Sequence, residues 1–233
     1  ASVLKLLKVH HEKIIFAGLY THFASAKDPN DTGYTKKQIS EFTSWIDDVR
    51  KNNFAPIVHA GATGGVLAFN ESHFDMVRVG IGMYGVYPSD AIEMHLKEKL
   101  KLQPILTWKT IISEIKEVSA GEGVGYDLTY ELLKKTKVAV CPVGYWHGYV
   151  RLLSNNGHVL VNGGVAPILG RISMDMITVD VSDIKNVKAG DEVVLIGMSE
   201  GKEITSDEFA KRASTTAYEI LTRLNPLMRR FYR

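Results

Sequence analysis

The chain has 233 residues, of which 45% are hydrophobic and 23% charged, and this balance excludes disordered, collagen-like and coiled-coil proteins. Its 28 basic and 26 acidic residues are scattered along the sequence, so we expect no nucleic-acid partner. No apolar run reaches the roughly 18 residues that a membrane-spanning helix needs, so we expect no membrane contact from this segment. The single cysteine, Cys141, excludes an internal disulfide and favours a reducing compartment, the cytoplasm.

The first residues, Ala1 to Lys8, carry neither an initiator Met nor the apolar stretch of a signal peptide. They have the pattern of the middle of a helix. We therefore expect the chain to be the carboxy-terminal portion of a longer polypeptide.

Up to about residue 100, short apolar runs alternate with helical patterns. The runs predict buried strands at 14–20, 55–60 and 76–81, and the spacing of apolar residues predicts a helix over 35–51 and a short one over 64–69. Strands that alternate with helices pair in parallel through right-handed crossovers. This part of the chain is therefore predicted to be α/β.

After Pro104 the apolar runs become short and are interrupted by Gly, Pro and Asn. They predict a mostly antiparallel β module with strands at 106–118, 137–143, 158–161, 165–168, 176–181 and 192–196. A helix capped by Thr205 or Ser206 follows, with a second helical segment over 216–224.

Polar residues follow the three predicted parallel strands, where sites form in α/β proteins. His22 ends the first strand, His59 the second, and Arg78 lies within the third, where a guanidinium needs a carboxylate or a ligand as partner. The small-residue turn 60–65 offers backbone amides and the Thr63 hydroxyl to an anion such as phosphate, or is a tight turn that Thr63 caps. A single histidine of this kind is more often a hydrogen-bonded core residue than a catalyst, but two of them together with Arg78 at corresponding strand ends favour a site.

In the β module, glycine-rich loops carry aromatic and polar side chains. Tyr126 lies on loop 121–127, Tyr145 on loop 144–149, and Asp175 on loop 170–176. These residues are either turn and rim residues or, for tyrosine, a proton-transfer group whose pKa its neighbours lower.

The ordered set of motifs resembles the fold-type III, pyridoxal-phosphate-dependent alanine racemases. The matching motifs follow the family's order over nearly the whole chain: Tyr20-Thr21-His22-Phe23, His59-Ala60 with Thr63, His73-Phe74-Asp75 through Arg78-Val79-Gly80-Ile81 to Met83-Tyr84-Gly85, Val124-Gly125-Tyr126, Pro142-Val143-Gly144-Tyr145 with Gly148-Tyr149, Ser173-Met174-Asp175, and Tyr218-Glu219-Ile220-Leu221.

The resemblance implies an α/β plus all-β protein in two domains. Residues 1–102 would be the second half of a (β/α)8 barrel that binds pyridoxal 5'-phosphate, and residues 103–233 the carboxy-terminal, mostly antiparallel β domain with its terminal helix. It also implies a homodimer in which Tyr126 reaches the partner's site, and a cofactor-bearing lysine that lies before residue 1, so that the fragment alone is inactive.

The resemblance also assigns roles to residues. Tyr126, His22 and Arg78 would be catalytic, Arg78 meeting the pyridine nitrogen of the cofactor and keeping it unprotonated. The cofactor would be held by Thr63, Arg78, His59 and the backbone of Gly80 and Ile81. The substrate would be bound by the Met174 amide, with Tyr145 and Asp175 at the entrance.

Two segments depart from the family pattern. Trp146 and His147 stand where the family usually has a small residue and an aspartate. Asn225 or Pro226 stands where alanine racemases carry a tyrosine that narrows the pocket. In this roomier, polar site the chain is similar to the racemase domain of the vancomycin-resistance serine racemases, which are anchored to the membrane in the intact protein. The similarity makes Asn225 a candidate partner for a serine hydroxyl.

We therefore expect an amino-acid racemase that interconverts L- and D-alanine or L- and D-serine for cell-wall precursor synthesis. Inversion needs two bases on opposite faces of the substrate, and Tyr126 would be one of them. The alternatives are a fold-type III decarboxylase, which Arg78 disfavours because those enzymes are expected to place an acidic residue at the pyridine nitrogen, and a non-catalytic barrel or dimerisation module.

Overall fold

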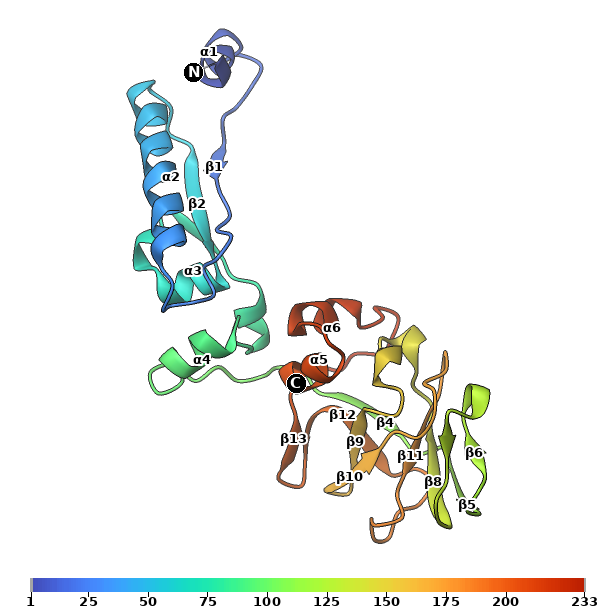
Figure 1. Ribbon diagram of the computed structural model, residues 1–233. Helices are drawn as coiled ribbons and strands as arrows, with labels where there is room; N and C mark the ends of the chain where they lie inside the picture. The colour runs from blue at the N-terminus through green and yellow to red at the C-terminus, as the bar shows by residue number, and fades with distance from the viewer. Residues whose placement is uncertain (1, 233) are drawn as a thin grey trace. The chain divides into compact units, whose positions relative to one another are not determined.

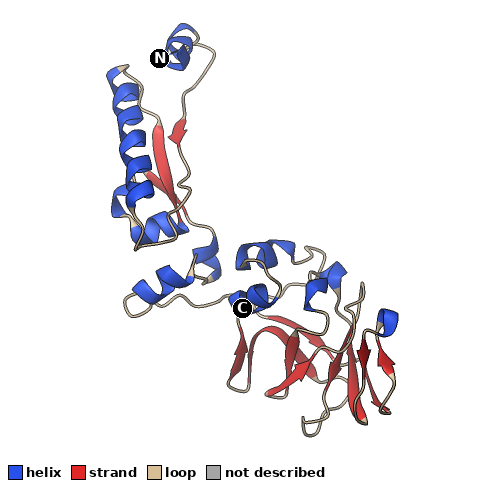
Figure 2. Cartoon of the chain, viewed as in Figure 1, coloured by secondary structure: helices blue, strands red, loops and turns tan. Residues whose placement is uncertain are grey.

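The structure is a computed structural model that describes residues 2–232. The chain forms two compact units that divide between Gln103 and Pro104 (Figure 1). Helices and parallel strands make up the first unit, and antiparallel strands predominate in the second (Figure 2). Within the described residues, no helix is both long and apolar enough to cross a membrane.

The first unit is a three-stranded parallel sheet in the order β1-β2-β3, with helices in the connections. Its elements are α1 (Ser2–Val9), β1 (Gly18–Tyr20), α2 (Gly33–Lys51), β2 (Ile57–Ala62), α3 (Thr63–Ala68), η1 (Asn70–Ser72), β3 (Met76–Arg78), η2 (Ile81–Tyr84) and α4 (Asp90–Leu96). The α/β prediction for this part of the chain is confirmed.

Helix α2 forms because its apolar residues recur on one face. Ile39, Phe42, Ile46 and Val49 are separated by three, four and three residues and are all buried, as the helical period requires. Ile39, Phe42 and Ile46 pack with Val58 of β2 and neighbouring apolar residues into the core of this unit.

The first predicted strand is shorter than its apolar run. The run begins at Ile14, but β1 covers only Gly18–Tyr20, and Ile15 is 89% exposed. Pro56 precedes the partner strand and has no N–H to donate, so the parallel ladder begins only with the hydrogen bond from Ile57 N to Ala17 O. The run of apolar residues does not show where the hydrogen-bonded strand begins.

The second unit contains three antiparallel sheets. One has the order β10-β9-β12-β13 with β4 also paired to β12, one the order β11-β8-β5, and β6 pairs with β7. Its elements are β4 (Trp108–Ile111), β5 (Glu114–Val118), β6 (Gly123–Val124), η3 (Tyr126–Leu128), β7 (Tyr130–Glu131), β8 (Thr136–Cys141), η4 (Tyr145–His147), η5 (Arg151–Leu153), β9 (His158–Val161), β10 (Gly164–Pro167), β11 (Ile177–Asp180), β12 (Glu192–Ser199), β13 (Lys202–Ile204), α5 (Ser206–Arg212) and α6 (Ala217–Arg223).

The continuous strand predicted over 106–118 is two strands. Ile112 donates to Asp191 O, next to β12, whereas Ser113 donates to Val140 O of β8. The chain therefore changes its hydrogen-bonding partner between these two residues and passes from one sheet to another. The apolar pattern continues across the junction because side chains on both strands are buried in the same core.

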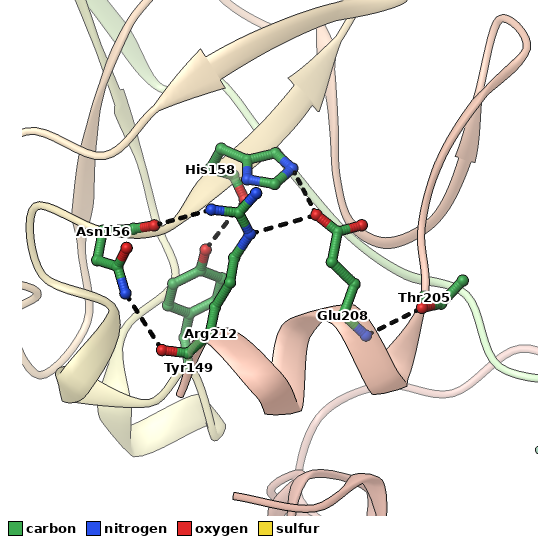
Figure 3. A network of polar contacts seen from close by, with 6 residues as sticks. All are labelled: Tyr149, Asn156, His158, Thr205, Glu208 and Arg212. Atoms are coloured by element: carbon green, nitrogen blue, oxygen red, sulfur yellow. Dashed lines mark hydrogen bonds and ion pairs between the residues drawn. The ribbon is translucent and has the colours of Figure 1, made fainter. Parts of the chain in front are cut away.

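Helix α5 is fixed to the sheet by a polar network (Figure 3). The Thr205 hydroxyl accepts from Glu208 N at 3.0 Å and caps the helix, as predicted. The Glu208 carboxylate lies 3.2 Å from Arg212 Nε and 3.5 Å from His158 Nε2 at the start of β9. Burial and the Arg212 charge lower the pKa of His158 against the opposing effect of Glu208, so the imidazole is held neutral.

Candidate functional site

In the first unit, the parallel register places aromatic and basic side chains side by side. Tyr20 of β1 pairs with His59 of β2, and their rings stack with centroids 5.3 Å apart. Arg78 of β3 follows next in the sheet, with its guanidinium carbon 5.6 Å from the Tyr20 ring centroid. The strand ends therefore present a cation over the Tyr20 ring, beside the imidazole that stacks on that ring.

Arg78 is bound by acceptors at the ends of the other two strands of the sheet, β1 and β2. Its Nη2 donates to Thr21 O at 2.8 Å and Ala60 O at 3.0 Å, and lies 3.3 Å from His22 Nδ1. Its Nη1 contacts His59 Nδ1. The structure thus brings together His22, His59 and Arg78. Among the described residues, Arg78 contacts carbonyl oxygens, imidazole nitrogens and the Tyr20 ring rather than a carboxylate, and a guanidinium keeps its charge at all ordinary pH values.

Beside this cluster, the Thr63 hydroxyl connects the start of α3 to the turn after β3. Thr63 is buried, and its Oγ1 accepts from Gly80 N at 3.1 Å and from Gly82 N at 3.3 Å. A Cβ placed on Gly80 would meet no atom within 4 Å, so the space beside this backbone is open. Ile81, whose backbone was predicted to bind phosphate, begins η2 with its side chain buried.

In the second unit, Tyr126 lies at the tip of the β6–β7 hairpin and is 70% exposed. Gly125 precedes it at φ 77°, and a side chain on Gly125 would clash with the backbone nitrogen of Arg171. The hairpin thus rests directly on the loop that leads to Met174. The phenol is presented outward from the surface of this unit.

Three further predicted site residues lie on one hydrogen-bonded double turn. Tyr145 N donates to Ser173 O and Trp146 N donates to Met174 O, both at 3.0 Å. Gly144 is required there, since its Cβ would lie 2.3 Å from Ser173 O. Tyr145, Met174 and Asp175 are all exposed on this double turn.

Asn225 anchors the segment after α6 to the same double turn. Its Nδ2 donates to Trp146 O at 3.0 Å, and its Oδ1 accepts from Leu227 N at 2.9 Å. His147, the second residue that departs from the family pattern, accepts from Gly144 N through Nδ1 and thereby stabilises the turn. Asn225 therefore has a structural role, and the second N–H of its amide is the group left for a ligand.

Sequence reasoning missed three contributors to these clusters. Tyr20 belongs to a quoted motif, but its stacking on His59 depends on the strand register. Gly82 donates to Thr63 as Gly80 does. Arg171 pairs with Asp127, next to Tyr126, across 44 residues of sequence. Register and long-range pairing could not be read from local patterns.

The two clusters offer complementary chemistry. The first unit provides a permanently charged donor between imidazoles and a hydroxyl beside open backbone, which suits an aromatic nitrogen and a phosphate. The second provides an exposed phenol, which can donate or accept a proton, on a hairpin that lies against the loop leading to Met174.

Two family descriptions match this chain. "Alanine racemase, C-terminal domain" matches residues 105–232, and "Alanine racemase, N-terminal domain" matches residues 1–88. The chain belongs to the alanine racemase family, as its motifs predicted.

Curated relatives and solved structures agree with this assignment. The chain is 43% identical to alanine racemase of Halothermothrix orenii over 217 residues. This matched region covers 93% of the chain and 56% of the relative. It is 37% identical to alanine racemase of Methanococcus maripaludis, over 100% of the chain and 61% of the relative. The chain thus spans little more than half the length of these relatives.

Among solved structures, alanine racemase from Bacillus anthracis with bound L-Ala-P is similar with a TM-score of 0.88 and 34% identity, covering 95% of the chain and 56% of that structure. Alanine racemase from Bartonella henselae, which is described with covalently bound pyridoxal phosphate, is similar with a TM-score of 0.83 and 29% identity. This match covers 99% of the chain and 61% of that structure. The family's architecture, part of a barrel followed by an antiparallel β domain, is confirmed.

Proposed function

We propose that this chain is the carboxy-terminal part of a pyridoxal-phosphate-dependent alanine racemase. The single observation that carries the proposal is the Arg78 cluster: an arginine held between His22 and His59 at the ends of parallel strands, beside the Thr63 hydroxyl. Membership of the alanine racemase family supports the proposal that this cluster holds the cofactor. In keeping with its cysteine content, the protein is assigned to the cytoplasm.

The residues of the first unit fit the cofactor's two polar ends. Thr63, with the amides of Gly80 and Gly82 turned towards its oxygen, would hold the phosphate, and the open space beside Gly80 admits a bulky anion. Arg78 would donate to the pyridine nitrogen. Pyridoxal phosphate bound there supplies a conjugated ring that makes the α-proton of an attached amino acid acidic.

Arg78 also determines how strongly the ring withdraws electrons. A guanidinium donates a hydrogen bond but does not give up its proton, so it leaves the pyridine nitrogen unprotonated. A cofactor ring that withdraws electrons only moderately favours return of the α-proton to the substrate over decarboxylation or other side reactions. This argues against the decarboxylase alternative, in which an acidic residue at the same place would protonate the nitrogen.

Tyr126 would move the proton on one face of the substrate. Its exposed position on the hairpin tip suits a residue that serves a site in the partner of a homodimer. A lysine outside these 233 residues would act on the other face. Two bases are needed because a single base returns the proton to the face from which it came.

Serine is the second candidate substrate, and one observation favours it. Asn225 and Pro226 stand where an aromatic residue would narrow the pocket, and one N–H of the Asn225 amide is left for a hydroxyl. A hydrogen-bonding pocket can select a substrate hydroxyl, whereas an apolar pocket rejects it only weakly. A preference for serine would extend the resemblance to the resistance-associated serine racemases.

The experiment is a racemisation assay of the intact polypeptide loaded with pyridoxal phosphate, with L-alanine and L-serine as separate substrates and chiral chromatography as the readout. We expect D-alanine to form, and a visible absorbance band that is lost on borohydride reduction. Asn225→Tyr should shift the ratio of kcat/KM towards alanine by about 1–3 kcal/mol if serine uses that amide. Absence of both products would reject the racemase proposal, and a colourless protein would favour the non-catalytic module.

A further inference from the structure

The hairpin that carries Tyr126 has little structure of its own. Strands β6 and β7 are two residues each, and Gly125, Asp127 and Leu128 all have positive φ angles. Hairpins of this size are marginal in water without outside support. Contacts from the rest of the second unit must therefore set the position of Tyr126.

One such contact is an ion pair. The Asp127 carboxylate lies next to Tyr126 in sequence, and its Oδ2 is 2.9 Å from Arg171 Nε. The Arg171 side chain is 35% exposed and the Asp127 side chain is 69% exposed, so the pair is shielded from water only on its arginine side. Arg171 stands three residues before Met174, and the pair thus connects the Tyr126 hairpin to the loop predicted to bind the substrate carboxylate.

A second contact also connects the hairpin to the loop that leads to Met174. The Asn155 side chain accepts from Gly170 N at 2.6 Å through Oδ1 and donates to Thr129 O at 3.2 Å through Nδ2. It therefore bridges the hairpin on one side and the residue before Arg171 on the other. Gly125 and Gly170 lie against each other between these two connections, where neither has room for a Cβ.

We propose that Asp127 and Arg171 are positioning residues, whose ion pair fixes the position of Tyr126 relative to the Met174 turn. This role rests on the proposed racemase function. A flexible hairpin would let the phenol sample many positions, and a displacement of about 1 Å can cost about 100-fold in rate. The pair limits that freedom at the residue adjacent to the phenol.

The test compares the intact, cofactor-loaded protein with Asp127→Asn, Arg171→Gln and the double variant. Asparagine tolerates the left-handed backbone of residue 127, so Asp127→Asn removes the charge without strain. The matched control is Glu192→Gln, which removes the Lys109–Glu192 pair of 2.7 Å on β4 and β12 of the same unit. Arg171→Lys tests rescue by a residue of the same charge.

Two readouts separate positioning from folding. The first is the primary isotope effect with α-deuterated L- and D-alanine. In Asp127→Asn and Arg171→Gln we expect kcat to fall by about 10- to 100-fold. The isotope effect should rise only for the enantiomer whose α-proton Tyr126 removes. The double variant should lose no more activity than either single variant. Glu192→Gln should match the parent, and Arg171→Lys should recover part of the rate.

The second readout is independent of catalysis. With 3-fluorotyrosine placed at position 126, the ¹⁹F resonance should move towards its value in urea in Asp127→Asn and stay unchanged in Glu192→Gln. If the parent fails to racemise alanine, the proposed function fails while this resonance still decides the positioning role. An unchanged resonance in Asp127→Asn, an isotope effect that changes equally for both enantiomers, or equal losses in Glu192→Gln would each overturn the inference.

Discussion

Tyr20 and His59 are partners across a parallel ladder, and their rings stack with only 3° between their planes. The stack fixes the imidazole whose Nδ1 contacts the Arg78 guanidinium. Because Arg78 also lies over the Tyr20 ring, one aromatic pair orients both the histidine and the arginine. The orientation of Arg78 therefore depends on the sheet register as much as on its own strand.

Arg78→Glu should change the spectrum of the cofactor-loaded intact protein. A carboxylate at this place raises the pKa of a facing pyridine nitrogen through its charge, so the ring becomes a stronger electron sink. We expect a new long-wavelength absorption band and reduced racemisation, measured by absorbance and chiral chromatography. Arg50→Glu, on helix α2, is the control and should leave the spectrum unchanged. A parent-like spectrum and rate in Arg78→Glu would mean that Arg78 faces something other than the ring.

Thr63→Val should both destabilise the protein and weaken cofactor retention. Valine has nearly the same shape but removes the oxygen that accepts from Gly80 N and Gly82 N, and a typical hydrogen bond contributes about 0.5–1.5 kcal/mol to stability. Thermal unfolding and cofactor loss on dialysis measure the two effects. Thr63→Ser keeps the oxygen and should behave like the parent. A Thr63→Val protein that keeps both properties would exclude Thr63 from the phosphate site.

The His158 network predicts that stability falls in mild acid. The pKa of His158 is lowered in the folded state from its ordinary 6.5, mainly by burial, so the unfolded chain binds the proton more readily. The His158 contribution is therefore complete above pH 6.5 and is lost as the pH falls through the folded-state pKa. Urea unfolding of the parent and of His158→Gln at pH 7.5 and pH 5.5 measures this. The variant should lose less stability between the two pH values, and an equal loss in both proteins would contradict the prediction.

Cys141 should be inert in the folded protein. Burial raises the pKa of its thiol to about 12, and its side chain is inaccessible in the core of the second unit. Iodoacetamide at pH 8 should leave the Cys141 peptide unlabelled by mass spectrometry, and label it in urea. Labelling of the native protein within minutes would show that this core opens.

The sequence predicted the alternation of α2 and the parallel strands because apolar periodicity follows the burial of one face, as at Ile39, Phe42 and Ile46. It did not predict β6, β7 or β13, which are short and depend on turns rather than on periodicity. It also did not predict α4, a helix of 7 residues whose start is capped by the Ser89 hydroxyl. It found Arg78, His22 and His59 as strand-end residues, and the structure brings them together. The stack of Tyr20 and the pairing of Asp127 with Arg171 depend on register and on tertiary contacts, which no local pattern contains.

The central claim is that Tyr126 is one of two bases, and its most direct test is the fate of the α-proton in Tyr126→Phe. The intact, cofactor-loaded variant is incubated in D₂O with L- or D-alanine, and α-proton loss is followed by NMR and inversion by chiral chromatography. The account predicts that inversion falls by about 10²- to 10⁴-fold, while one enantiomer still exchanges its α-proton for deuterium with retention, since the base on the other face remains. Inversion of both enantiomers at the parent rate would contradict it.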